Sequence, residues 1–345
     1  MSVDLSTTYL GLGLRNPMVA AACPLTGDLD ALRRMEEAGA AAVVLPSLFQ
    51  EQLERDALAV RQLLTAGPED CERILARLPE LDAYNTGPAG YLRHLKRAKA
   101  ALSIPVIASL SGSGDGDWTR HAQLLEEVGA DALELNVYFV PTDPDVTAEA
   151  VESRYIDLVA AIAEATTIPV AVKLGPYFSA LPNLARRLVE IGADGLVLFN
   201  RYLQPEIDVE GLQVAPHLAL STPDELRLPL RWIAILRPQL SASLAGTCGV
   251  HTAEDVVKLI LAGADAVMTA SALLRHGPEY VRVLLDGLST WLEDRSYDCL
   301  SSIKGALSGH GGPDRSAFER ANYVRAITTF SEFFIEASDL AAQDH

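Results

Sequence analysis

EEAGAAAVVLPS at residues 36–47 ends a charged helical stretch with Gly-Ala and continues at once into an apolar, β-branched run. The same pattern returns as EEVGADALELNV at 126–137, VEIGADGLVLFN at 189–200 and ILAGADAVMTAS at 260–271. Glycine ends a helix well because it takes the left-handed conformation without a Cβ clash. A short run without polar alternation is typical of a parallel strand that is buried on both faces. Each unit therefore predicts a helix followed directly by a buried strand.

Four further apolar runs lie between these units. They are NPMVAAA at 16–22, IPVIASL at 104–110, IPVAVKL at 168–174 and ASLAGT at 242–247. Proline suits the first position of a strand, where no ladder hydrogen bond is lost. Interleaving the two sets gives eight strands, each followed by a helical segment, which predicts an α/β fold of the (β/α)8 TIM-barrel type. An open doubly wound sheet is the alternative, but eight evenly spaced units with no second composition favour the barrel.

The domain organisation follows from the same spacing. Residues 1–305 are expected to form one barrel domain, because α/β barrels commonly run past about 200 residues. Three connections after strands are long, and loops at this end of the strands build active sites in barrels. They are 48–90, 137–150 and 201–222. After the eighth helix, GHGGPDRS precedes a helical run at 317–337, so residues 306–345 are interpreted as a C-terminal helical extension packed on the barrel.

The charge balance bears on the partners. The 345 residues include 28 basic and 46 acidic side chains, which gives a formal net charge of -18. Such a surface repels phosphate backbones, so a nucleic-acid partner is not expected. A bound phosphate would have to be held by local backbone amides rather than by a general positive field.

The apolar runs and the cysteines bear on the compartment. No apolar run reaches the roughly 18 residues that a membrane span needs. Residues 1–13 carry neither a basic region nor a cleavage-like site, so we expect a cytoplasmic protein without membrane association. The cysteines are far apart and form no CxxC pair, which argues against a metal site. They are Cys23, Cys71, Cys248 and Cys299.

Most of the predicted strands end in polar or cysteine residues, although the strands themselves are apolar. Buried polar groups need partners, so these ends predict a ligand site at one mouth of the barrel. The ends are Ala22 and Cys23, Pro46 and Ser47, Ser109 and Ser111, Asn136, Lys173, Asn200, residues 247–249, and residues 269–271. The seventh and eighth ends consist of small residues before helix starts, which is typical of the phosphate site of barrels.

Lys173 lies inside the apolar run VAVKLG, where its ammonium is expected to face the mouth. It could stabilise the anionic edge of a reduced flavin, or form a Schiff base if burial lowers its pKa. Asn136 and Asn200 carry amide groups that both donate and accept, which suits a planar carbonyl ligand. For His217 and His251 a structural or solvent-exposed role is favoured over ligation.

Several segments together resemble the dihydroorotate dehydrogenases, in order and in spacing, from residue 16 to 305. They are NPMVAAAC, ELNV, VAVKLGPYF, the strand end at Asn200, LSTPDELRLPLRWI, GTCGVHTAEDVVKLILAGADAV and SALLRHGP. The resemblance implies an FMN-dependent barrel that oxidises dihydroorotate to orotate, a step of pyrimidine metabolism.

The resemblance also implies roles for particular residues. The residues expected at FMN are Ala22, Ser47, Asn136, Lys173, Phe199, Thr222, Cys248, Gly249, Ala270 and Ser271. Those expected at the substrate are Asn85, Thr86, Gly87, Asn200 and Arg201. The guanidinium fork of Arg201 is the best candidate for a substrate anion. Lys173 is the expected stabiliser of the reduced flavin.

Three positions depart from the family pattern. Phe139 stands where the family carries its Cys or Ser base, and a phenyl ring cannot take a proton. Pro46 replaces a lysine, and Arg201 replaces a serine on the substrate side. Tyr138, one position from Phe139, is the candidate proton donor. The cofactor positions are largely kept while those for dihydroorotate are not, which predicts a divergent branch that oxidises dihydroorotate poorly.

Three functions stay open at this point. The first is an FMN oxidoreductase acting on CH–CH bonds of a small planar or carboxylated substrate, as a homodimer. The second is a non-redox barrel enzyme, an aldolase or isomerase, that uses Lys173 and the phosphate site on a sugar phosphate. The third is a flavin-binding protein without catalysis, because the usual base is missing.

Overall fold

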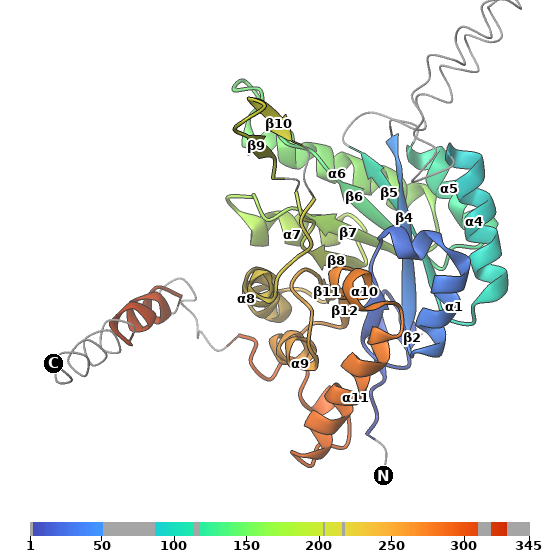
Figure 1. Cartoon of the computed structure of the whole chain (residues 1–345). Helices are drawn as coiled ribbons and strands as arrows, with labels where there is room; N and C mark the ends of the chain where they lie inside the picture. Colours follow the sequence, from blue (N-terminus) through green and yellow to red (C-terminus); the bar gives the residue numbers. More distant parts are fainter. Residues whose placement is uncertain are drawn as a thin grey trace, which may run out of the picture.

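The computed structural model describes residues 3–50, 87–112, 118–202, 204–215, 218–309 and 319–329. Eight parallel strands close into a barrel in the order β11-β12-β3-β4-β5-β6-β7-β8, and β11 also pairs with β8 (Figure 1). This closure confirms the predicted barrel and excludes the open sheet. The strands are β3 (Met18–Ala20), β4 (Ala42–Phe49), β5 (Val106–Gly112), β6 (Ala132–Val137), β7 (Val170–Leu174), β8 (Gly195–Leu198), β11 (Ser243–Gly246) and β12 (Ala266–Thr269).

Helices surround the barrel and follow the strands in the expected alternation (Figure 1). They are α1 (Leu29–Glu37), α4 (Gly87–Ala101), α5 (Trp118–Val128), α6 (Ala148–Ala165), α7 (Leu181–Glu190), α8 (Arg227–Leu236), α9 (Ala253–Ala262) and α10 (Ser271–His276). A further helix, α11 (Tyr280–Glu293), follows α10. Short 3-10 turns are η1 (Pro24–Gly27), η2 (Pro223–Leu226), η3 (Arg237–Gln239) and η4 (Leu300–Ser302).

The glycines of the four Gly-Ala units end their helices as predicted. Gly39, Gly129, Gly192 and Gly263 have φ values of 111°, 103°, 113° and 111°. These values lie in the left-handed region, where a side chain would meet the backbone and only glycine is free of strain. The chain thereby turns from each helix straight into the next strand.

The aspartate that follows three of these Gly-Ala pairs has a role that the sequence pattern did not reveal. Asp131 Oδ2 accepts a hydrogen bond from Val106 N at 2.7 Å, and Asp194 Oδ2 accepts one from Val170 N at 2.8 Å. Asp265 Oδ2 accepts from Leu244 N at 2.8 Å in the same way. Each carboxylate satisfies an amide at the start of the preceding strand, so the Gly-Ala-Asp repeat also fixes strand register.

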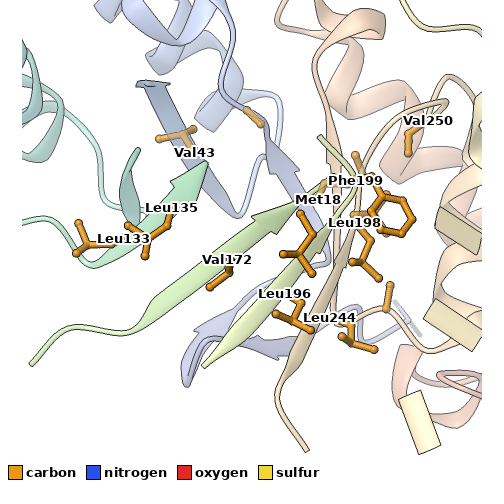
Figure 2. Packing of buried hydrophobic residues seen from close by; sticks show 14 of the residues in the cluster. Met18, Val43, Leu133, Leu135, Val172, Leu196, Leu198, Phe199, Leu244 and Val250 are labelled. Carbon is orange, nitrogen blue, oxygen red and sulfur yellow. The ribbon is translucent and has the colours of Figure 1, made fainter. Parts of the chain in front are cut away.

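Two apolar layers hold the barrel together. Odd positions of β6, such as Leu133 and Leu135, join the larger cluster between strands and helices, whereas Ala132 joins the cluster inside the barrel. Figure 2 shows part of the larger cluster, with Val172 and Leu196 on the paired strands β7 and β8. The inner cluster includes Tyr9 and Leu14 of an N-terminal hairpin. This hairpin, β1 (Thr7–Tyr9) and β2 (Leu12–Leu14), closes the lower end of the barrel (Figure 1).

Two segments project from this framework. A second hairpin, β9 (Glu206–Asp208) and β10 (Gln213–Ala215), rises from the loop after β8. Residues 319–329 are helical and almost entirely exposed, and an ion pair of 2.5 Å joins Glu319 to Arg231 of α8. The packing of residues 306–345 on the barrel stays a prediction. Within the described ranges, no helix is long and apolar enough to cross a bilayer.

Candidate active site

A cavity of about 230 Å³ opens at the C-terminal ends of the strands. Its lining comes from the ends of β7 and β12 and from the segments after β3, β8, β11 and β12, so it collects positions that are up to 253 residues apart, from Ala21 to Leu274. Nine of the predicted site residues line it: Ala22, Lys173, Phe199, Asn200, Arg201, Cys248, Gly249, Ala270 and Ser271. This placement agrees with the prediction that small and polar strand ends meet at one mouth of the barrel.

The turn after β11 has two consecutive residues in the left-handed region. Cys248 has φ 75° and Gly249 has φ 72°. Within the described part of the chain, no carbonyl or side chain accepts from the amides of these two residues. Successive free amides in a turn can form an anion-binding concavity.

At the start of helix α9, part of the backbone donors expected for a phosphate are already used within the chain. Thr252 and Asp255 form a capping box at its N-terminus. The Asp255 carboxylate accepts from the amides of His251 and Thr252 at 3.1 and 2.9 Å. The amides of His251 and Thr252 are therefore not available to an anion, whereas those of the turn at Cys248 and Gly249 are.

Gly249→Ala is expected to destabilise the fold far more than a left-handed glycine normally implies. A Cβ at this position would lie 2.2 Å from Leu226 N, which is backbone and cannot move aside easily. We expect a loss of about 3 kcal/mol in the free energy of unfolding, measured by urea denaturation. Gly11 is the matched control, because its φ is 73° with nothing within 4 Å, and Gly11→Ala should cost about 1 kcal/mol. Equal losses in both variants would contradict the close approach.

Lys173 points into the barrel mouth and is paired with a residue of the neighbouring strand. Its Nζ lies 3.3 Å from Oε1 of Glu134, and the two side chains are 10% and 1% exposed. Among the described residues, the other oxygen of Glu134 is buried without a hydrogen-bond partner, as is the hydroxyl of Tyr9. Burial, and secondarily the charges of Glu134 and Asp265, raise the pKa of Tyr9 well above its usual value. The phenol is therefore neutral, and the ion pair of Glu134 is with Lys173.

Two further predicted residues lie beneath or beside the cavity and do not line it. Asn136 accepts a hydrogen bond through Oδ1 from Nδ2 of Asn200 at 2.6 Å, which fixes both amide groups. Ser47 and Ser109 share a hydrogen bond of 2.8 Å between their Oγ atoms inside the barrel. Asn136 thus acts on the mouth through Asn200, and Ser47 is held by the neighbouring strand.

The titratable groups around the cavity are mostly held neutral. Burial raises the pKa of Cys248 to about 11, and its thiol donates to Phe199 O at 3.2 Å. Burial also raises the pKa of the Cys23 thiol. Burial lowers the pKa of His251, whose Nε2 lies 3.2 Å from Ser221 Oγ, in agreement with a structural role. A neutral thiol is a weak nucleophile, so neither cysteine is suited to covalent catalysis.

Arg201 lies between the first cavity and a larger one of about 740 Å³, and lines both. Its Nε is 2.8 Å from Glu225 Oε2, and its Nη1 donates to Ala219 O at 2.6 Å. Two donors of the guanidinium group, Nε and Nη1, therefore already have partners within the chain. Its role as the anchor of a substrate anion stays a prediction, with fewer free donors than the sequence suggested.

A group of tyrosines forms one wall of the larger cavity. Tyr177 and Tyr202 line it, whereas Tyr138 lines neither cavity and packs on Tyr202 with ring centroids 4.5 Å apart. Tyr155 donates its hydroxyl proton to Val137 O at 3.0 Å and lies 3.2 Å from the hydroxyl of Tyr202. The Tyr202 hydroxyl also lies 3.5 Å from Phe139 O, to which it can donate. The contacts of Tyr202 with Tyr138 and Tyr155 therefore hold its side chain in place.

The remaining predicted residues lie outside the two cavities or outside the described ranges. Thr222 caps η2 beside Ser221, whose amide donates to Ser271 Oγ at 3.0 Å. Gly87 begins α4 with φ 72°. Asn85, Thr86, Cys71 and His217 lie outside the described residues. No group of three or more metal-ligating side chains is found in the part of the chain that is described.

Sequence reasoning missed three residues of this region. Glu134 sits within an apolar strand, and only its register with β7 shows that it meets Lys173. Tyr177 and Tyr202 come from separate loops and carry no spacing signal. The capping box of α9 was visible as Thr-Ala-Glu-Asp at 252–255.

Comparison with known proteins agrees with this geometry. The family model described as dihydroorotate dehydrogenase matches residues 76–292. A protein of Aeropyrum pernix named putative dihydroorotate dehydrogenase A (fumarate) is 32% identical over 213 residues, which cover 59% of this chain and 67% of that protein. The catalytic subunit of dihydroorotate dehydrogenase B (NAD(+)) of Thermoplasma acidophilum is 26% identical over 314 residues, covering 88% and 98%. The protein of the same name from Methanosarcina acetivorans is 28% identical over 300 residues, covering 86% and 93%. The chain belongs to the dihydroorotate dehydrogenase family.

Proposed function

We propose that this protein is an FMN-dependent oxidoreductase that acts on a CH–CH bond of a small planar substrate other than dihydroorotate. The observation that carries the proposal is the set of strand ends around one cavity. Nine residues expected at the cofactor or the substrate line it together. Membership of the family supports the reaction class and the cofactor.

The phosphate end of FMN fits the turn after β11 and the segment after β12. The amides of Cys248 and Gly249 are free of partners within the described residues, and Ala270 and Ser271 begin the short helix α10. Glycine is required at 249 because a Cβ there would meet the backbone of Leu226. Backbone amides can hold the phosphate without a positive surface, as a chain of net charge -18 requires.

The ring end of FMN fits the slot between Ala22 and Lys173. When bound, FMN supplies the two-electron redox chemistry, which amino-acid side chains lack. Lys173 would hold the pyrimidine edge of the ring by charge and hydrogen bonding. Asn200, fixed by Asn136, would present its amide to the ring or to the substrate above it. Phe199 is 3% exposed and helps to exclude water from this end.

The Schiff-base alternative is less well supported. A lysine nucleophile needs its neutral amine, which burial without a counter-charge would favour. Lys173 instead has the carboxylate of Glu134 as a counter-charge, 3.3 Å from its Nζ. A sugar-phosphate enzyme would therefore account for the phosphate end of the cavity, but not for the ion pair of Lys173 with Glu134.

The substrate side is proposed to select a planar molecule by stacking. Tyr177 and Tyr202 line the larger cavity, and their ring centroids lie 5.5 Å apart. The Tyr202 hydroxyl is held by Tyr155 and Phe139 O, and its oxygen can still accept a hydrogen bond from a substrate N–H or O–H. Tyr138 packs behind Tyr202 and is less suited to proton donation than the sequence suggested. Homodimer formation and a cytoplasmic location remain part of the proposal, by analogy with the family.

The absorbance spectrum of the purified protein tests the proposal, together with mass spectrometry of the molecule that heat releases. A flavin spectrum and released FMN are expected. A colourless protein that does not take up FMN on reconstitution would refute the cofactor. Borohydride trapping of a sugar phosphate on Lys173 would then support the aldolase alternative. FMN that no donor reduces would favour the flavin-binding protein without catalysis.

A further inference from the structure

We infer that Glu134 is a positioning residue that places the ammonium of Lys173 at the mouth and offsets its charge toward the cofactor. The inference rests on the proposed function, because it concerns the electrostatic field at the bound FMN. It concerns a residue to which neither the motif comparison nor the reaction class gives a role.

Glu134 lies inside the barrel, directly below Lys173. Its side chain points inward with Ala132 and Asn136, since alternate residues of a strand face the same side. Asn136 pairs with Lys173 in the register of β6 and β7, which places Glu134 one layer below the ammonium. The carboxylate therefore contacts Lys173 from the interior, on the side away from the mouth.

Within the described residues, Lys173 is the one charged partner of Glu134. A buried carboxylate is normally held by several donors, because an unsatisfied oxygen is costly. Among the described residues, one oxygen of Glu134 has no donor and the other has Lys173 at 3.3 Å. Tyr9 is neutral, and Ser109, which pairs with Glu134 across β5 and β6, is engaged with Ser47. The negative charge is thus directed almost wholly at Lys173.

The other groups near Lys173 do not change this balance. Cys23 and Cys248 sense its charge, but burial raises the pKa of both, so they are neutral thiols. Arg201 is paired with Glu225. The field that Lys173 exerts on a ligand in the cavity is therefore reduced chiefly by Glu134, which lies behind it.

Neutralising Glu134 should make the electrostatic potential at the cofactor site more positive. The affinity of the bound flavin for an anion measures this change directly. Sulfite adds reversibly to oxidised flavins, bleaches their visible absorption, and binds more tightly when positive charge lies near the ring. We expect Glu134→Gln to lower the sulfite dissociation constant of the FMN-loaded protein about tenfold at about pH 6, where an ammonium keeps its proton. The reduction potential of the bound FMN should become more positive.

Three variants separate charge from structure. Glu134→Met also removes the charge and leaves no polar group in the barrel, so it should tighten sulfite binding as well. Glu134→Asp keeps the charge and should bind sulfite as the wild type does. Glu152→Gln is the outer control, because Glu152 pairs with Arg187 at 2.9 Å between α6 and α7, and it should have no effect.

The outcomes are distinct from those of the proposed function. Wild-type protein without FMN would defeat the proposed function itself. FMN-loaded Glu134→Gln with unchanged sulfite affinity and potential would overturn the role of Glu134. The same holds if both neutral variants lose FMN, since Glu134 would then serve only to hold the site together. Equal tightening in Glu152→Gln would also overturn it, because the effect would follow net charge alone.

Discussion

We expect dihydroorotate to reduce FMN bound to this protein about 10² to 10⁴ times more slowly than it reduces the FMN of a family member that carries the Cys or Ser base. The loss is expected because the resemblance puts Phe139 at the base position, and a phenyl ring cannot accept the proton that leaves with the hydride. The ring of Phe139 lies under Arg154 of α6, with 4.2 Å from the guanidinium carbon to the ring centroid. The loop after β6 is thus packed on α6 and on Tyr202.

The measurement is anaerobic mixing of FMN-loaded protein with dihydroorotate, followed by the bleaching of the flavin in a single turnover. This isolates the substrate step from the unknown electron acceptor. Phe139→Cys should bleach faster than Phe139→Leu, by about tenfold, because only cysteine, through its thiolate, can take a proton. Wild-type bleaching as fast as in a family member with the base would contradict the prediction.

The fold was predictable because its signals are local. Each Gly-Ala unit combines a helix end and a strand start within twelve residues, and the four glycines do adopt the left-handed conformation. Ile104-Pro105 and Ile168-Pro169 mark two of the remaining strands in the same way. The order of strands then follows from right-handed crossovers between neighbours, with little further freedom.

The site was predictable only in part, because its groups meet through register and loop packing. The strand ends could be assigned to one mouth, since parallel strands end on the same side. The pairing of Glu134 with Lys173 depends on the register of β6 against β7. The contact of Tyr155 with Tyr202 joins residues 47 positions apart, and Arg201 meets Glu225 across a loop. Composition and spacing contain none of these distances.

Lys173→Met is expected to have the largest effect on stability. It removes the cation beside a carboxylate that is 1% exposed and has no other donor among the described residues. Removing one partner of a buried pair costs about 3–5 kcal/mol, because the charge left behind is uncompensated. Urea unfolding, followed by far-UV circular dichroism after FMN has been stripped from every variant, measures this loss.

The double variant Glu134→Gln/Lys173→Met distinguishes charge from packing. If the cost of Lys173→Met arises from the stranded carboxylate, neutralising Glu134 in the same chain should recover most of it, and the two changes should not add. Arg187→Met is the matched control, since Arg187 pairs with Glu152 at 2.9 Å and is 38% exposed. A partly exposed pair contributes about 1 kcal/mol or less. If Lys173→Met cost no more than Arg187→Met, or if the double variant lost the sum of its parts, Glu134 would not depend on Lys173. The ion pair would then neither hold the barrel interior together nor shape the charge at its mouth.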